Sequence, residues 1–518
     1  MPHPVRFPRV PPGLLLITLL VSAPIAVHAQ DAPDKAPAAM AENSIVKVFS
    51  TIRAPDLTKP WTKQAAREVT GSGIVIEGQR ILTNAHVVLY ASQVQIQANQ
   101  AGDKISATVE TLAPGIDLAV LKLDDASFFD THPALPRASA LPQIKDPVLV
   151  YGFPTGGASL SITKGIVSRL EFASYNFPVF GLRVQIDTAI NPGNSGGPAL
   201  VGDKMIGLAF SHLTNTQNIG YIIPCEEIEL FLKDIADGHY DGKPGIFDEF
   251  QSLENPALRA YLKLDKNVKG LVVRAPYSND PAYPLRQWDV VTKIGDTPID
   301  DQGMIKFGDY PPIRFTYLAQ KIASGGTVPL TVLRGGKEIP VALPVEARYH
   351  KLIPFLQGAY PSYFIYGPLV FSPATEDDLA LLTGNATNGA STSTVLSILG
   401  SPLVTRRGAK QAFDGEELVL IPSPFFPHRL AKGYVAPGTM IVRRVNGIPI
   451  KNLLHLVEVL RNATDEFIVI EFATRSAETM VFPRAEMVAA TEEILTDNGV
   501  RTQGSPDALG VWNAKPAK

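Results

Sequence analysis

The sequence has little cysteine, little charge and few long apolar runs. Cys225 is the single cysteine among 518 residues, which excludes an internal disulfide framework and any multi-thiolate metal site. Charged residues make up 19% of the chain, and the formal net charge is −3. Nucleic-acid binding needs a basic field that this balance does not supply. Beyond the N-terminus, no apolar run reaches the roughly 20 residues that a membrane-spanning helix requires.

Proline and glycine are abundant instead, with 44 and 41 residues. They suit a chain of short strands and turns better than one of long helices. Hydrophobic residues make up 45% of the sequence, enough to bury several cores. At roughly 150 residues per domain, this length predicts three or four domains.

The N-terminus has the pattern of a secretory signal peptide over residues 1–29. A basic start leads into a thirteen-residue apolar run, residues 14–26, which ends shortly before the small residue Ala29. The run is short for a membrane span, so a cleaved signal is favoured over an uncleaved anchor. We therefore expect a periplasmic or secreted protein with no other membrane contact, in which the Ala/Pro-rich residues 30–43 form a linker.

Residues 44–240 contain many short β-branched runs separated by Gly, Pro and Asn. Regular short strands of this kind predict an all-β barrel or sandwich. The stretch Glu226–Ala236 has helical spacing and closes the region.

The second half contains a partial internal repeat. Asp289–Ile299 (DVVTKIGDTPI) and Met440–Ile450 (MIVRRVNGIPI) align without gaps at an offset of 151 residues. This repeat predicts two related domains, at 245–346 and 347–485. We expect the low-complexity stretch 383–394 to be a mobile loop, and residues 486–518 to be the end of a helix and a loose tail.

Residues 193–198 read GNSGGP and place Ser195 between glycines. A glycine-rich turn can expose the serine hydroxyl and aim backbone N–H groups at one point, where an oxyanion would form. The same G-x-S-x-G pattern also occurs at the nucleophile elbow of α/β-hydrolases. An elbow requires a following helix, but Pro198 and a strand-like segment follow here, so the elbow interpretation fails.

A serine nucleophile needs a base and a group that orients that base. His86 follows an apolar strand in ILTNAHVV, and Asp117 lies in the apolar strand of PGIDLAVLKL. A buried carboxylate costs several kcal/mol unless it is paired, and an imidazole N–H is its natural partner. Each residue alone is more often structural, but the three together in the order His, Asp, Ser predict a catalytic triad. No carboxylate or histidine cluster has metal-ligand spacing, and the serine route needs neither metal nor cofactor.

These stretches, with TGSGIVI (70–76), TKGIVS (163–168) and NIGYIIP (218–224), resemble the HtrA/Deg family of serine proteases. Later segments, including FLQGAYPSYFIYGPLVFSP (355–373), resemble the plant-organelle type of Deg protease. The resemblance implies a mainly β protein: a chymotrypsin-like double β-barrel protease domain followed by two PDZ-like α+β domains, the second divergent. It also implies a homo-oligomer, a trimer or an assembly built from trimers.

By this resemblance His86 is the general base, Asp117 orients it and Ser195 is the nucleophile. The backbone N–H groups of Gly193, Asn194 and Ser195 would line the oxyanion hole. Ala189 would form the base of the specificity pocket, where it offers no charge for Lys or Arg, so we expect cleavage after small aliphatic residues. The remaining substrate-binding candidates are the pocket walls and the strand beside the substrate backbone: Leu208, Ala209, Phe210, Ser211, Ile219 and Tyr221.

A PDZ domain binds an extended peptide by strand addition beside a loop of backbone N–H groups. Our candidate for that loop and strand is Arg259–Leu264, with Tyr261, Leu262, Lys263 and Leu264 as peptide-binding residues. Trp288 stands where the family usually has Gly before Asp. The aromatic run from Phe355 to Phe371 favours core and domain packing over substrate capture.

The sequence thus predicts an ATP-independent serine endopeptidase that degrades unfolded or damaged proteins in the cell envelope. Three alternatives stay open at this point. The protein could be a chaperone that holds unfolded chains, a regulatory protease that cuts one protein at a defined site, or a PDZ adaptor without catalytic activity.

Overall fold

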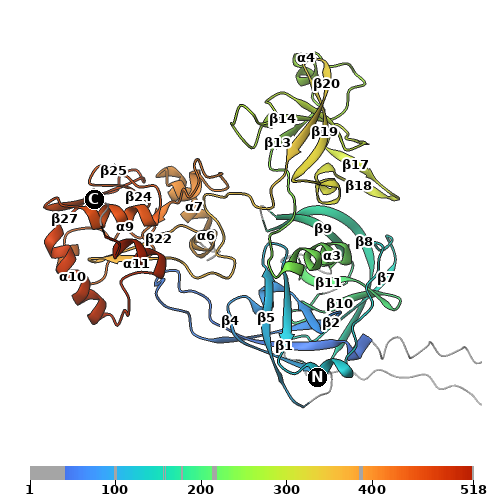
Figure 1. Ribbon diagram of the computed structural model, residues 1–518, viewed down its shortest axis with the longest axis horizontal. Coiled ribbons are helices and arrows are strands. Elements are labelled where there is room, and N and C mark those ends of the chain that lie inside the picture. The colour runs from blue at the N-terminus through green and yellow to red at the C-terminus, as the bar shows by residue number, and fades with distance from the viewer. Residues whose placement is uncertain are drawn as a thin grey trace, which may run out of the picture.

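The computed structural model describes residues 41–98, 102–155, 157, 159–176, 179–188, 190–212, 219–383 and 389–515. The predicted signal peptide and all but the end of the predicted linker lie outside these residues. Within them the chain forms two β-barrels and two further lobes (Figure 1). The prediction of a mainly β protein with a chymotrypsin-like double barrel is confirmed.

The first barrel is closed, with strand order β1-β2-β3-β6-β5-β4. Its β-branched and aliphatic side chains point inward: in β6 only Lys122 is exposed. The one-turn helix α2 (Ala85–Val88) follows β3, and the 3-10 helix η1 (Ala126–Asp130) follows β6. The strands are β1 (Ile45–Ile52), β2 (Arg67–Ile76), β3 (Arg80–Thr83), β4 (Ala91–Ala98), β5 (Ile105–Ala113) and β6 (Leu118–Leu123).

The second barrel is also closed, with order β10-β11-β12-β9-β8-β7. Helix α3 (Cys225–Asp234) and the 3-10 helix η2 (Ile235–Asp237) follow it, where the sequence predicted a closing helix. The buried face of α3 packs into a core shared with both barrels. The strands are β7 (Pro147–Gly152), β8 (Ser161–Asn176), β9 (Val179–Ile186), β10 (Pro198–Val201), β11 (Lys204–His212) and β12 (Gly220–Pro224).

The third lobe is the first PDZ-like domain, at the top of Figure 1. Its main sheet has the antiparallel order β13-β14-β15-β19-β20, so β13 and β20 are its edges. Its strands are β13 (Glu249–Ser252), β14 (Leu271–Ala275), β15 (Val290–Ile294), β16 (Thr297–Pro298), β17 (Met304–Phe307), β18 (Tyr310–Arg314), β19 (Thr327–Arg334) and β20 (Lys337–Pro344). Its helices are α4 (Pro256–Tyr261), η3 (Phe315–Leu318) and α5 (Ala319–Ile322).

The fourth lobe is the C-terminal PDZ-like domain. Its strands are β21 (Phe364–Tyr366), β22 (Leu369–Pro373), β23 (Val419–Leu420), β24 (Val442–Val445), β25 (Ile448–Pro449), β26 (Phe467–Phe472) and β27 (Met480–Pro483). Its helices are α6 (Glu376–Thr383), α7 (Gly389–Ile398), α8 (Pro402–Thr405), η4 (Arg429–Ala431), α9 (Leu453–Asn462), α10 (Arg484–Asp497) and α11 (Pro506–Trp512).

The internal repeat corresponds to the same piece of structure in both lobes. In the first, β15 and β16 form a tight antiparallel pair, with Ile294 opposite Thr297. In the second, β24 and β25 do the same, with Val445 opposite Ile448. Each hairpin then joins its sheet through a later strand, β19 or β26.

Two predictions for the C-terminal lobe are wrong. The chain after α10 is not a loose tail, because α11 packs on α9: Ala508 is fully buried and the Trp512 ring lies 5.1 Å from that of Phe364. The low-complexity stretch is also not simply a loop. Residues 384–388 lie outside the described residues, but α7 begins at Gly389.

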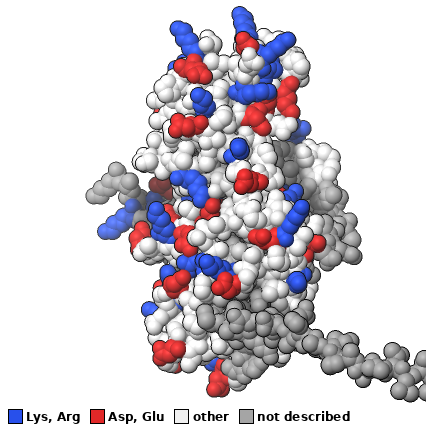
Figure 2. All heavy atoms as spheres, turned by 90° about the vertical axis from the view of Figure 1, so that its right-hand side faces the viewer, with Lys and Arg blue, Asp and Glu red and all other residues white. Residues whose placement is uncertain are grey.

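The lobes contact one another through packed and hydrogen-bonded residues, and Phe172 and Leu182 of the second barrel belong to the same hydrophobic core as the first PDZ-like domain. Hairpin β17–β18 rests on the second barrel, where the Tyr310 hydroxyl donates to the Leu141 carbonyl at 3.1 Å. The loop between β1 and β2 reaches the C-terminal lobe, where the Trp61 ring lies 5.3 Å from Phe426 and 6.2 Å from Tyr363. On the face shown in Figure 2, acidic and basic side chains are interspersed and neither sign forms a continuous patch.

Candidate active site

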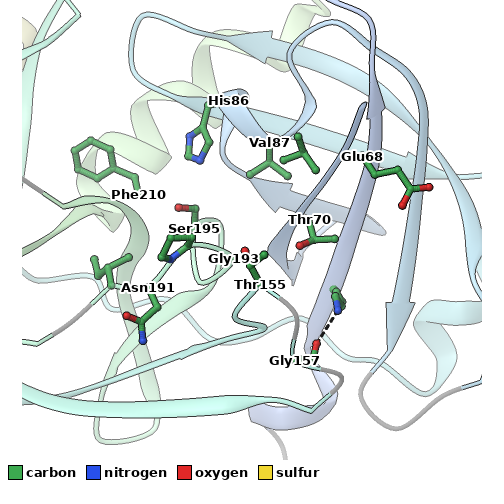
Figure 3. A pocket seen from close by; sticks show the side chains of 14 residues that line it. Glu68, Thr70, His86, Val87, Thr155, Gly157, Asn191, Gly193, Ser195 and Phe210 are labelled. Atoms are coloured by element: carbon green, nitrogen blue, oxygen red, sulfur yellow. Dashed lines mark hydrogen bonds between the residues drawn. The ribbon is translucent and has the colours of Figure 1, made fainter. Parts of the chain in front are cut away.

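The two barrels enclose a cleft of about 910 Å³, lined by both His86 and Ser195. Figure 3 shows His86 above Ser195, between two groups of residues. Phe210 lies on one side of the pair, while Thr70 and Glu68 of β2 lie on the other. The two residues that the sequence predicted as base and nucleophile therefore share one cleft.

His86 is fixed by Asp117 through two separate contacts. Its ring Nδ1 lies 2.8 Å from Oδ2 of Asp117, and its backbone N–H donates to Oδ1 at 2.9 Å. The carboxylate thus fixes the orientation of the imidazole ring and the position of the short helical turn that carries it. This contact orients Nδ1 toward the carboxylate and leaves Nε2 facing away as the basic nitrogen.

The sequence predicted Asp117 within an apolar strand, but the structure places it in the turn just before β6. Its φ of +56° is in the left-handed region, which a non-glycine residue adopts only when its surroundings stabilise it. Here the Asn84 side chain does so, donating from Nδ2 to the Asp117 carbonyl at 2.9 Å. The turns at residues 84–86 and 114–117 therefore hold each other in place.

The environment of His86 favours its protonated form. Burial lowers the pKa of the imidazole, but the hydrogen bond and the negative charge of Asp117 outweigh burial and raise the pKa above 6.5. The ring remains 47% exposed, whereas the side chain of Asp117 is 14% exposed. An imidazole with this pairing is a stronger base than a free one and remains accessible to a substrate.

The nucleophile loop requires glycine at positions 193 and 196. Gly193 has φ +99° and Gly196 has φ +86°. A Cβ on Gly193 would lie 2.4 Å from the Phe153 carbonyl, and one on Gly196 would lie 2.0 Å from the Ser72 carbonyl. The loop is thus pressed against both barrels, which is how the glycines of the motif hold Ser195 at the interface.

The oxyanion donors differ in one residue from the prediction. The backbone N–H of Asn194 donates to the Asn191 carbonyl at 2.9 Å, so it is not available to a substrate. Among the described residues, nothing accepts from the backbone N–H of Gly193 or of Ser195. These two groups are therefore the donors that an oxyanion can use, and assigning Asn194 as a third donor was wrong.

Two anchors set the direction of the Gly193 N–H group. The Pro192 carbonyl accepts from the Thr155 N–H at 2.8 Å, and in a trans peptide the N–H points the opposite way from the carbonyl. The Gly193 carbonyl accepts from the Ser72 hydroxyl, also at 2.8 Å. With both flanking carbonyls held, the Gly193 N–H cannot turn without breaking a hydrogen bond.

In this structure no hydrogen bond joins His86 to Ser195, both of which are described residues. Such contacts are often long in substrate-free enzymes and tighten when a substrate binds. The Ser195 carbonyl is held by the Ser72 N–H at 2.8 Å, so the backbone of the nucleophile is already fixed.

The predicted specificity pocket is only partly described. Ala189 lies outside the described residues, and so does the side chain of Ser211. Leu208 and Ala209 are fully buried in the barrel cores, and Tyr221 is 3% exposed, so their side chains are not the walls expected from the sequence. Ile219 is half-buried and does not line the cleft. Phe210 alone of these candidates lines it.

The backbone of Ala209 is also unavailable to a substrate strand. Its N–H donates to the Gly197 carbonyl at 2.9 Å, and its carbonyl accepts from the Gly196 N–H at 2.8 Å. Both groups thus support the nucleophile loop, and the prediction that a substrate strand pairs with Ala209 is wrong. Sequence reasoning could not find this, because the partners lie twelve or more residues away.

Several cleft residues were not predicted. Ile190 and Asn191 line the cleft directly before the nucleophile loop, and their proximity to the motif was a usable signal. Thr70 and Glu68 come from β2, and Thr155 comes from the loop after β7. Nothing in the local sequence marks these three, because folding alone brings them to the cleft.

The predicted peptide-binding segment of the first PDZ-like domain is wrong. Tyr261 ends helix α4, and Leu262–Leu264 form the turn after it, so the segment is not a strand and offers no sheet edge. Tyr261 is 68% exposed and contacts the Trp288 ring. The free edges of this sheet are β13 and β20.

The described residues contain no group of three or more His, Cys, Asp or Glu side chains that could hold a metal ion. They also contain no helix with the length and apolar character needed to cross a membrane. Cys225 is buried, and burial raises the pKa of its thiol to about 12, which leaves it unreactive at neutral pH.

Comparison with known proteins gives matches over both halves of the chain. Residues 71–208 match the Trypsin-like peptidase domain family, and residues 356–507 match a PDZ domain family. A solved structure of the HtrA-type protease AlgW with decapeptide aligns with a TM-score of 0.47 and 24% identity, covering 60% of this chain and 98% of that one.

Curated relatives extend the match to nearly the whole chain. Protease Do-like 2, chloroplastic, of Arabidopsis thaliana is 34% identical over 476 residues, covering 90% of this chain and 75% of the relative. Protease Do-like 4, mitochondrial, of the same plant is 33% identical over 452 residues, covering 86% and 82%. The predicted family and the predicted serine endopeptidase activity are both confirmed. The chain belongs to the Do-like (Deg/HtrA) family of serine proteases, and its two barrels, its paired His86 and Asp117 and its Ser195 in a glycine-rich loop fit that family.

Proposed function

We propose that this protease degrades unfolded or damaged proteins in the cell envelope and cleaves after small aliphatic residues. Ser195 is the nucleophile, His86 the general base and Asp117 the group that orients His86. The observation that carries the proposal is the 2.8 Å contact between His86 Nδ1 and Asp117, in the cleft that also holds Ser195.

The proposed reaction follows from this arrangement. The Ser195 hydroxyl attacks a peptide carbonyl while Nε2 of His86 takes its proton, and Asp117 stabilises the imidazolium that forms. His86 then returns the proton to the leaving amine, which departs and leaves an acyl-enzyme. A water molecule enters, loses its proton to His86 and releases the acyl group from Ser195.

The tetrahedral intermediate carries its negative charge on the former carbonyl oxygen. The N–H groups of Gly193 and Ser195 are the free donors of the nucleophile loop and receive that oxygen. Each such donor is worth about 3–4 kcal/mol of transition-state stabilisation. Thr155 and Ser72 fix the direction of the Gly193 N–H. The Asn194 carbonyl, which shares a peptide group with the Ser195 N–H, accepts from the Gly197 N–H at 3.0 Å, so little reorganisation of either donor is needed during the reaction.

The lining of the cleft supports an apolar preference on the acyl side. Phe210 lies on the side of the cleft away from β2 (Figure 3), and Ile190, 4% exposed, lines the same cleft. The charged lining residues Lys47 and Glu68 belong to β1 and β2. An apolar pocket without a charge favours Val, Ala, Leu or Ile over Lys or Arg at the cleaved position.

The location and the assembly are part of the same proposal. Export rests on the signal-like pattern of residues 1–29. The relatives carry the words chloroplastic and mitochondrial in their names, and those words describe the relatives only. A homo-oligomer based on trimers is proposed from the family resemblance, and protein chains are the partners that such an assembly would act on.

Digestion of a reduced, unfolded test protein by the chain without residues 1–29 tests the proposal. Ser195→Ala serves as the matched control, and fragments are mapped by mass spectrometry. We expect cleavage after Val, Ala, Leu and Ile, abolished in the control. Fragments ending in Lys or Arg would contradict the apolar pocket. Suppressed aggregation without cleavage would contradict the proposed function and favour a chaperone.

A further inference from the structure

Among the predicted substrate residues whose side chains the structure describes, Phe210 is the one that lines the cleft. It lies at an irregularity of the β11–β12 pairing, between Ala209 and Ser211, where the register shifts. A residue at such a bulge has no direct cross-strand partner to fix it. Whatever holds its ring therefore determines the shape of this side of the cleft.

Tyr175 provides that support from β8. Its ring stacks on Phe210 with centroids 5.1 Å apart and planes 28° apart. Tyr221 is more distant, at 6.5 Å and tilted. Both Tyr175 and Phe210 pack as partly buried side chains against the core that the two barrels share. Of these two described rings, Tyr175 makes the stacked contact that can set the orientation of Phe210.

Resting on the proposed function, we propose that Tyr175 is a positioning residue, which holds the Phe210 ring against the acyl side of the substrate. Phe210 supplies the apolar contact to the substrate, and Tyr175 acts only through Phe210. This assignment goes beyond the triad and beyond the specificity pocket, because Tyr175 does not line the cleft.

Tyr175 is itself held at both ends of its side chain. Its hydroxyl donates to the Leu182 carbonyl at 2.6 Å. Its ring passes so close to Gly181 that a Cβ there would lie 2.7 Å from Cε2. Burial and the charge of Glu227 raise the pKa of the Tyr175 hydroxyl well above its ordinary value, so it stays a donor across the working pH range.

The Leu182 peptide is anchored in turn on helix α3. Its N–H donates to Oε1 of Glu227 at 2.7 Å. Glu227 is 1% exposed and also receives Lys243 Nζ at 2.5 Å and Gln320 Nε2 at 3.1 Å. A buried carboxylate with three donors is a rigid anchor, since moving it would leave a buried charge unpaired. The support of Phe210 therefore extends from the cleft to the interface with the first PDZ-like domain.

Two peptides that differ only in carrying Leu or Ser at the cleaved position, the residue that the proposed apolar pocket binds, test this role. We expect the wild type to favour Leu. Tyr175→Leu should raise KM for the Leu peptide about fivefold, the size expected for the loss of one aromatic pair, with kcat within about twofold. Tyr175→Phe keeps the ring stack and should restore most of the preference for Leu.

A double-mutant cycle with Phe210→Leu separates positioning from a general structural effect. If Tyr175 acts through Phe210, Tyr175→Leu should change the Leu/Ser ratio little once Phe210 is already replaced. Tyr240→Leu is the matched control, since it removes another tyrosine that packs on an aromatic ring, that of Phe231, in the same domain. This control should leave the ratio unchanged.

An unchanged Leu/Ser ratio in Tyr175→Leu, or equal effects of that change with and without Phe210, would overturn the inference. If Tyr175→Leu fails to fold, Gly181→Ala replaces it, because the added methyl group displaces the Tyr175 ring. It should lower the same ratio, and no change there would also contradict the role. A wild type that cleaves neither peptide contradicts the proposed function instead, so the two failures are distinguishable.

Discussion

At the scale of single residues, the geometry of the candidate active site depends on the carboxylate of Asp117. Its two oxygens bind the ring and the backbone of His86, and its carbonyl binds Asn84. The left-handed φ of +56° is the cost of this geometry. One residue thus fixes the tautomer, the orientation and the basicity of the proposed general base.

The first prediction concerns pH. Because Asp117 raises the pKa of His86 above 6.5 and only neutral imidazole acts as a base, kcat/KM should increase with pH through an apparent pKa above 6.5. In Asp117→Asn the raising effect is lost while burial still lowers the pKa, so this limb should move to lower pH. The maximum rate should fall about ten-thousandfold, as expected for a wrongly oriented imidazole.

Both expectations are checked by measuring peptide hydrolysis by the wild type and by Asp117→Asn between about pH 5 and 9, a range that brackets the ordinary pKa of histidine. Circular dichroism at each pH serves as the control for folding. A limb that stays at the same pH in the variant would show that another group titrates.

At the scale of elements, the turn before β15 stands out in the first PDZ-like domain. Trp288 has φ +74°, and the next residue, Asp289, is 2% exposed and pairs with Arg334. The left-handed conformation explains why glycine is the residue expected at this position in the family. The Trp288 side chain gains a contact with Tyr261, with ring centroids 5.5 Å apart, that glycine cannot make.

The second prediction compares two substitutions at this position. Trp288→Gly and Trp288→Ala both remove the contact with Tyr261, but only alanine keeps the backbone strain of a left-handed residue. Trp288→Gly should therefore be more stable than Trp288→Ala by about 1 kcal/mol, after the higher unfolded-state entropy of glycine is included. Denaturant unfolding of the full chain measures the difference. If Trp288→Ala were the more stable variant, the backbone at position 288 would not be strained for a non-glycine residue, which would contradict the prediction.

Much of the architecture could be predicted from the sequence, and the exceptions share a physical cause. Short β-branched runs indicated the barrels, and the repeat indicated two related domains, in which it corresponds to the hairpins β15–β16 and β24–β25. The GNSGG motif allowed the turn at Ser195 to be predicted, because the left-handed backbone of Gly193 and Gly196 is a local property that glycine marks in the sequence. Ala209 was misassigned because its backbone partners come from the nucleophile loop, a tertiary contact that no local pattern reveals. Helix α11 was not predicted because it is too short to be stable alone, and its packing on α9 stabilises it.

At the scale of the whole molecule, long-range contacts fix the lobes on the protease. The loop between β1 and β2 reaches the C-terminal lobe (Figure 1). There the Trp61 ring of this loop contacts Tyr363 and Phe426. The Tyr360 hydroxyl adds a hydrogen bond to the Arg53 carbonyl at 2.8 Å. Most of the aromatic run 355–371 is buried in its own lobe, in agreement with the packing role favoured from the sequence.

The third prediction is that Trp61→Ala releases the C-terminal lobe. The change removes a partly buried ring that packs against the C-terminal lobe, and each lost aromatic pair costs about 0.5–1.5 kcal/mol beyond the area buried. Small-angle X-ray scattering should show a larger radius of gyration than that of the wild type. Cleavage of a short peptide should stay within about twofold, since no cleft residue is touched. An unchanged radius would contradict the anchoring role.

The most direct test of the central claim is covalent labelling of the chain with a fluorophosphonate, followed by identification of the modified residue. We expect a single label on Ser195, formed at a rate that increases with pH as His86 loses its proton. In His86→Ala the rate should fall about a thousandfold, because the hydroxyl lacks its base. A label on another residue, or an equal rate in His86→Ala, would contradict the triad assignment.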